Sequence, residues 1–171
     1  IADILGKSAA RNLVSVSDYT GQPEMQGGLV KTLDFKIYLG LLSETYNEAH
    51  GADLRRTQAV AIDMVVVNLY PFQATVAKAG VTPEEARTNI DIGGPCMIRA
   101  AAKNFLRVAS VTDPADYDVM LAELRLLSGQ LSLERRLMLA RKAFAHTAAY
   151  DAAIAGYLAH QSFDDVAACY A

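Results

Sequence analysis

The sequence has few cysteines and little surplus of charge. Its two cysteines, Cys96 and Cys169, have neither the spacing of metal ligands nor the density of a secreted disulfide scaffold, which favours a reducing, cytoplasmic environment. A formal net charge of −3, from 16 basic and 19 acidic residues, gives no electrostatic footprint for DNA, RNA or a membrane surface. We therefore predict no metal site and no nucleic-acid partner, and any recognition of phosphate must be local.

Long apolar runs and an export signal are also missing. No segment approaches the roughly 20 apolar residues that span a bilayer, and the chain does not open with a charged-then-apolar signal peptide. We therefore expect no membrane partner. The first residue is Ile1 rather than Met, and residues 1–8 read like the middle of a helix without a start signal, so we expect the natural protein to begin earlier.

Helical and β-type patterns alternate along the 171 residues, of which 52% are hydrophobic. The β-branched run 62–68 is typical of a strand buried on both faces, and 108–112 predicts a second strand. The other predicted elements are a short strand at 13–17, a loop at 18–28, helices at 82–88, 95–105 and 114–127, and a helical stretch at 132–160 that is either continuous or broken near Gly156. This alternation predicts one α/β domain with a parallel sheet, in which ligands bind at the carboxyl ends of strands.

The segment 89–104 places an acid, a glycine pair and a proline directly before a short helix that contains a lysine. Gly93 and Gly94 let the backbone approach a ligand closely, and Pro95 fits the first turn of a helix. Amides at the N-terminus of a helix attract negative charge. The segment can therefore bind an anionic ligand, although a Gly-Gly-Pro sequence before a helix is more often simple loop punctuation.

Four side chains near the predicted strand ends and helix starts are candidates for chemistry: Lys31, Tyr70, Asp91 and Lys103. Lysines stabilise an anion or donate protons, while aspartate and tyrosine orient and exchange them. Each candidate also has a structural interpretation, since the lysines suit a solvated surface, the tyrosine suits a sheet edge and the aspartate suits the cap of a turn. The residues alone leave both interpretations open.

Six stretches, in order over nearly the whole chain, match the motifs of one enzyme family. They are 16–21 with 23–25, 30–33, 65–72, 89–104, 113–117 and 142–151. On these stretches the chain resembles the inosinate (IMP) cyclohydrolase region of the bifunctional purine-biosynthesis enzyme that also carries an aminoimidazole carboxamide ribonucleotide formyltransferase. A set of motifs in family order is far more specific than any one of them.

The resemblance implies a fold and a reaction. The fold is a methylglyoxal-synthase-like α/β core over residues 1–128, with a parallel sheet flanked by helices, and a C-terminal helical extension of the same unit over residues 129–171. The reaction uses no cofactor: the carboxamide nitrogen of 5-formamidoimidazole-4-carboxamide ribonucleotide attacks the formyl carbon, and water leaves to give inosine monophosphate. The implied partners are this small purine ribonucleotide and a second copy of the chain in a homodimer.

The resemblance also assigns roles to residues. An amide nitrogen is a poor nucleophile, so its proton must be removed while the formyl oxygen is stabilised and then protonated. By motif position, Lys103 corresponds to the family's proton-transfer lysine, and Asp91, Tyr70 and Lys31 correspond to its other catalytic-pocket residues. The substrate-binding positions are Thr32, Asn68, Ile92, Gly93 and Gly94.

Two positions depart from the family pattern. A pocket arginine is replaced by Leu29, and a histidine by Asp34. Leu29 removes a cation with its fork of donors, and Asp34 adds a negative charge near the expected position of an anionic substrate. The family's N-terminal phosphate-binding parts and its formyltransferase region fall outside this sequence, so the formyltransferase activity is not predicted.

Two interpretations of the chain stay open. Either the natural protein has an ordinary N-terminal part and closes the purine ring, or it is a truncated relative that binds a nucleotide or a partner subunit without turnover. The apolar stripe along 132–160 suits a dimer interface, as the resemblance also suggests, and equally suits packing against the chain's own sheet.

Overall fold

The computed structural model describes residues 13–23, 25–26 and 31–170. In chain order its elements are α3 (Val16–Thr20), α4 (Phe35–Leu42), α5 (Glu48–Thr57), β1 (Met64–Val66), α6 (Phe72–Val76), α7 (Pro83–Thr88), α8 (Gly93–Lys103), β2 (Ala109–Val111), η3 (Pro114–Asp116), α9 (Tyr117–Leu126), α10 (Leu133–Ala159) and α11 (Phe163–Ala168). Residues 1–8 and Leu29, which the sequence singles out, lie outside the described residues. Within the described part, no helix has the length and apolar character needed to cross a membrane.

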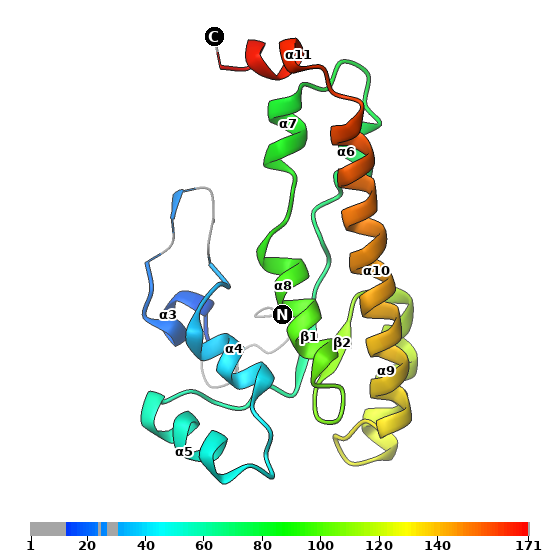
Figure 1. The fold of residues 1–171 in the computed structure, drawn as a ribbon. Helices are drawn as coiled ribbons and strands as arrows, with labels where there is room; N and C mark the ends of the chain where they lie inside the picture. The colour runs from blue at the N-terminus through cyan, green and yellow to red at the C-terminus, as the bar shows by residue number, and fades with distance from the viewer. Residues whose placement is uncertain (1–12, 24, 27–30, 171) are drawn as a thin grey trace.

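A small parallel sheet lies beside α8 and α10 (Figure 1). Its two strands, β1 and β2, pair with Met64 opposite Ala109 and Val66 opposite Val111. Both predicted strands are therefore present and parallel, but each is shorter than its β-branched run. Within the described residues, each strand pairs only with the other.

The crossover from β1 to β2 runs through α6, α7 and α8. Thr82, at the start of the helix predicted over 82–88, caps α7 and forms a capping box with Glu85. α8 begins at Gly93, two residues before its predicted start. It begins early because the Asp91 carboxylate accepts a 2.8 Å hydrogen bond from the Gly94 amide and thereby holds the first turn.

The predicted strand at 13–17 is wrong, because residues 16–20 form α3. The Ser15 hydroxyl accepts a hydrogen bond from the Asp18 amide at 3.0 Å, and such a cap outweighs the weak β preference of a short apolar run. α3 ends at Gly21, whose φ of 76° is the left-handed conformation that glycine favours. The predicted loop therefore begins at Gly21 rather than at Asp18.

α10 is one continuous helix of 27 residues, not two helices broken near Gly156. It packs against α8, β2 and α6 and runs along most of the length of the described molecule (Figure 1). Its contact with α8 is made largely by small side chains, in a buried cluster of Ile98, Ala102, Ala140 and Ala143. Of the predicted apolar stripe, Ala140 is buried within the chain, whereas Leu133 and Phe144 are exposed.

α4, which the sequence patterns did not predict, packs against α8 on the side away from α10 (Figure 1). Its C-terminal carbonyl groups are bound by side chains from the segment between α8 and β2. Asn104 donates from Nδ2 to the carbonyl oxygens of Leu41 and Ser43, at 2.8 and 3.0 Å. Arg107 donates from Nε to Ser43 at 3.0 Å and from a terminal nitrogen to Gly40 at 2.5 Å. Carbonyls that the helix itself leaves without donors are thereby satisfied.

Replacing the Arg107 side chain tests this contact. Arg107→Ala is expected to lower the free energy of unfolding by about 2–3 kcal/mol, because a side chain that is only 12% exposed would no longer donate to the Gly40 and Ser43 carbonyls. Urea denaturation measures the loss. The control is Arg56→Ala, which removes an exposed ion pair with Asp53 and should cost less than about 1 kcal/mol. Equal losses in the two variants would contradict the assignment.

A second long-range contact holds the start of α10. The Glu123 carboxylate of α9 accepts hydrogen bonds from the Ser132 amide and from Arg135 Nε, both at 2.7 Å. The hydrogen bonds lower the pKa of Glu123 to about 2 from its ordinary value of 4.5, and those from Ser132 make the largest contribution, followed by that from Arg135.

Because the pKa of Glu123 is lower in the folded than in the unfolded chain, this contact contributes its full stability above about pH 4.5 and loses it as the pH falls toward about 2. Glu123→Gln should therefore flatten that part of the dependence of unfolding free energy on pH. Denaturation curves between pH 2 and pH 6 measure it. The prediction would be refuted if the free energy of unfolding fell equally steeply with decreasing pH in the parent and in the variant.

Candidate functional site

A cavity of about 510 Å³ lies where the carboxyl end of β1 meets the N-terminus of α8. Three segments far apart in sequence form it: the turn before α4, the exit of β1, and the loop between α7 and α8. Its walls are Lys31, Thr32, Leu33, Val67, Tyr70, Thr88, Ile90, Asp91, Ile92, Gly93, Gly94 and Met97. Its position agrees with the expectation for ligands of parallel sheets.

Seven of the nine predicted site residues line this cavity. They are Lys31, Thr32, Tyr70, Asp91, Ile92, Gly93 and Gly94. The structure does not bring the other two into the wall. Asn68 is exposed on the exit of β1, two positions before the tyrosine. Lys103 is the exposed last residue of α8, about 15 Å along the helix from its first residue.

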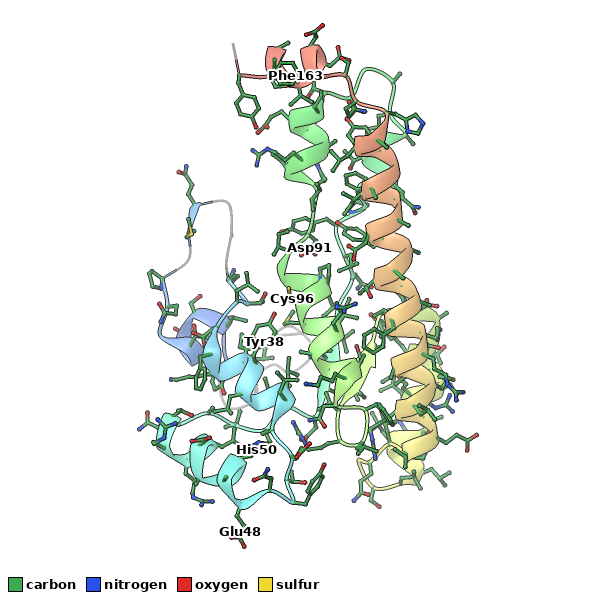
Figure 2. All side chains as sticks on the ribbon, in the orientation of Figure 1. Tyr38, Glu48, His50, Asp91, Cys96 and Phe163 are labelled. Atoms are coloured by element: carbon green, nitrogen blue, oxygen red, sulfur yellow. The ribbon has the colours of Figure 1, made fainter. Side chains whose placement is uncertain are left out.

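Asp91 is held from two sides. Its Oδ1 accepts the hydrogen bond from the Gly94 amide, and its own amide donates to the Tyr150 hydroxyl at 2.8 Å. That hydroxyl in turn donates to the Asn89 carbonyl at 3.1 Å. Figure 2 shows Asp91 on the segment that joins α7 to α8. The first turn of α8 therefore holds the Asp91 carboxylate, and a side chain of α10 holds its backbone.

The glycine pair is required by close contacts. A Cβ atom at Gly94 would lie 2.6 Å from both Asp91 Oδ2 and Leu69 Cδ2, and one at Gly93 would collide with Thr32 Oγ1. Three separate segments of the site thus meet at these two residues. The glycines have a structural reason to be here that goes beyond loop punctuation.

The N-terminus of α8 offers amide donors to the cavity. The Gly94 amide is used by Asp91 and Pro95 has none, while those of Ile92 and Gly93 have no acceptor within the described residues. They lie at the N-terminus of an 11-residue helix, where partial positive charge stabilises an anion or an oxygen that gains negative charge.

The described wall combines few charges with several apolar side chains. Lys31 and Asp91 have opposite charges, and Tyr70, 51% exposed, adds a phenol group. The apolar part consists of Leu33, Val67, Ile90 and Met97. A wall of this composition suits a small heterocyclic ligand with polar substituents.

Asp34, one of the two departures from the family pattern, has a local role. Its Oδ1 accepts a 2.8 Å hydrogen bond from the Lys36 amide, which makes it the N-cap of α4. It is not among the residues that line the cavity. The Asp34 carboxylate therefore has a structural role, which is to cap the N-terminus of α4.

Tyr150 belongs to the site but was not predicted from the sequence. Its hydrogen bond to the Asp91 amide joins residues 59 positions apart, so no local pattern predicts it. The available signal was its place in the family-like stretch 142–151. Burial raises the pKa of Tyr150, which keeps its hydroxyl protonated and able to donate to Asn89.

Comparison with known proteins gives two family matches. Residues 3–96 match the MGS-like domain and residues 101–170 match the AICARFT/IMPCHase bienzyme. The bifunctional purine biosynthesis protein PurH of Nostoc sp. (strain PCC 7120) is 51% identical over 152 residues, which cover 89% of this chain and 30% of that protein. PurH of Neisseria gonorrhoeae is 52% identical over 154 residues, with coverages of 90% and 29%. The chain thus spans under a third of the length of the curated relatives it matches.

A solved structure supports the same grouping. The crystal structure of ForH superposes with a TM-score of 0.75 at 36% identity, over 90% of this chain and 78% of that one. Together with the MGS-like match, this confirms the predicted fold class, an MGS-like α/β domain with a parallel sheet flanked by helices.

Substitution by alanine should have opposite effects on stability at Gly94, which has close neighbours, and at Gly156, which has none among the described residues. Gly94→Ala should lower the free energy of unfolding by about 1–3 kcal/mol, because the added methyl displaces Asp91 or Leu69. Gly156→Ala, in α10 with nothing within 4 Å of its added Cβ, should raise it by about 0.5–1 kcal/mol. Urea denaturation of both variants gives the comparison, and a Gly94→Ala protein as stable as the parent would disprove the close contact.

Proposed function

The chain belongs to the MGS-like domain family and is homologous to one region of the PurH proteins of purine biosynthesis, and on this basis we propose that it is an IMP cyclohydrolase. The proposed substrate is 5-formamidoimidazole-4-carboxamide ribonucleotide and the product is inosine monophosphate. The observation that carries the proposal is that seven residues chosen from sequence motifs converge on one cavity.

The proposed reaction is an internal condensation. The carboxamide nitrogen attacks the carbon of the formyl group on the same substrate, so that a C–N bond forms. The carboxamide nitrogen and the formamido nitrogen each give up one proton, and both protons leave with the formyl oxygen as water. Since only protons and water are transferred, the proposal includes no cofactor.

This chemistry needs a proton acceptor, donors for the formyl oxygen and a wall that holds both groups together. Asp91 suits the acceptor role, because Gly94 binds its Oδ1 while Oδ2 has no hydrogen bond within the described residues. The amides of Ile92 and Gly93 suit the oxygen that gains negative charge. Lys31 and Tyr70 complete the proposed set as groups that can donate protons.

Two residues enter the proposal by motif position alone. Asn68 is proposed as a substrate contact and Lys103 as the proton-transfer lysine, although neither lines the cavity. Thr32 is proposed as a substrate contact both by motif position and because it lines the cavity.

The proposal extends to assembly and location, as a cytoplasmic homodimer. Exposed apolar side chains on α10 support the dimer, namely Leu133, Phe144 and Leu158, because side chains of this kind are commonly buried between subunits. Light scattering on the purified protein would give its mass in solution, and a strictly monomeric protein would remove the dimer from the proposal.

Turnover of the formylated substrate by the full-length protein, with spontaneous ring closure subtracted, tests the function. Asp91→Asn should lower kcat by about 10²–10⁴-fold, because the amide cannot accept the proton. Asp164→Asn, on the exposed face of α11, is the matched control and should keep the parent rate. A folded parent without turnover would favour a non-catalytic nucleotide-binding module, and an Asp91→Asn enzyme with full rate would remove Asp91 from the chemistry.

Lys103 and Lys31 are tested in the same assay. Loss of turnover in Lys103→Ala would assign that lysine to the reaction. Because Lys103 does not line the cavity, this result would also mean that the reaction takes place with Lys103 in a different position relative to the substrate. A full rate in Lys103→Ala together with a loss in Lys31→Ala would place the catalytic lysine in the cavity wall.

A further inference from the structure

Tyr150 connects α10 to the loop that carries Asp91. It is 8% exposed and belongs to a buried cluster with Phe72 of α6 and Ala86 of α7. Its ring meets the Phe72 ring edge to face, with centroids 6.2 Å apart. Partly buried Leu69, on the exit of β1, and Ile90 pack against the same cluster. The ring is therefore held by residues of α6, α7 and the loop before α8, and one of them, Ile90, also lines the cavity.

The hydroxyl of this clamped ring binds the backbone on both sides of Ile90. It accepts from the Asp91 amide at 2.8 Å and donates to the Asn89 carbonyl at 3.1 Å. Asn89 is the C-cap of α7, so the hydroxyl joins the end of one helix to the residue that holds the start of α8. A single rigid side chain thus bridges the turn between two helices.

We infer that Tyr150 is a positioning residue that fixes the Asp91 carboxylate through the loop backbone. The inference rests on the proposed function, in which Asp91 accepts a proton from the substrate. Tyr150 does not itself line the cavity, so it acts through Asp91 rather than on the substrate. The Gly94 amide reports on the carboxylate, because it donates to Asp91 Oδ1 and not to Tyr150.

Tyr150→Phe removes the hydroxyl and keeps the clamped ring. Tyr157→Phe is the matched control, since Tyr157 lies two turns further along α10 and its ring also meets Phe72 edge to face, at 5.8 Å. No hydrogen bond from Tyr157 to residues 89–91 occurs within the described structure. The amide exchange rates of Asp91 and Gly94, measured by NMR on the full-length protein, give a readout independent of turnover.

In Tyr150→Phe the amides of both Asp91 and Gly94 should exchange about tenfold faster than in the parent. Turnover should fall by roughly 10²-fold in kcat, as expected for a misplaced catalytic group, with KM changed by less than about threefold. The melting temperature should fall by only about 2–4 °C. Tyr157→Phe should match the parent in all of these measurements.

Three results would overturn the inference. They are an unchanged Gly94 exchange rate in Tyr150→Phe, faster exchange in an active enzyme whose kcat is unchanged, and a lower melting temperature with parental kcat, which would reduce Tyr150 to a packing role. A parent without turnover would refute the proposed function separately, and the Gly94 exchange rate would still decide whether Tyr150 positions Asp91.

Discussion

The hydrogen bond from the Gly94 amide to Asp91 is the contact on which the described site depends. It starts α8 two residues earlier than the proline suggests, and it directs the carboxylate into the angle between that helix and the exit of β1. The bond needs glycine, because a larger residue would displace the carboxylate. One constraint thus sets the helix start, the position of the acid and the shape of the cavity wall.

The rest of the fold holds α8 in place around this point. α4 packs on one side of the helix and α10 on the other (Figure 1), and small side chains let α10 approach closely. The carbonyls at the end of α4 are bound by Asn104 and Arg107, which follow α8 in the chain. Because both ends of α8 are held by contacts with other segments, its N-terminal residues, which line the cavity, keep a defined position.

The sequence predicted those parts of the molecule that local chemistry determines. The helix at 82–88 and the parallel pairing of two β-branched runs follow from short patterns, and the motif match located most of the cavity wall. Local chemistry was misread at α3, where the Ser15 cap outweighed an apolar run. Long-range contacts could not be predicted, because no pattern near Asp91 indicates that Tyr150 binds its amide. The predicted helix over 95–105, in contrast, already separates Lys103 from the glycine pair, and α8 does carry this lysine away from the cavity.

NMR mapping of bound inosine monophosphate tests whether a purine ribonucleotide binds at the N-terminus of α8. The largest changes in chemical shift are expected at the amides of Ile92 and Gly93, with further changes at Tyr70. Changes confined to the separate cavity around Lys78 and Val81, or no changes at saturating nucleotide, would contradict binding at this position.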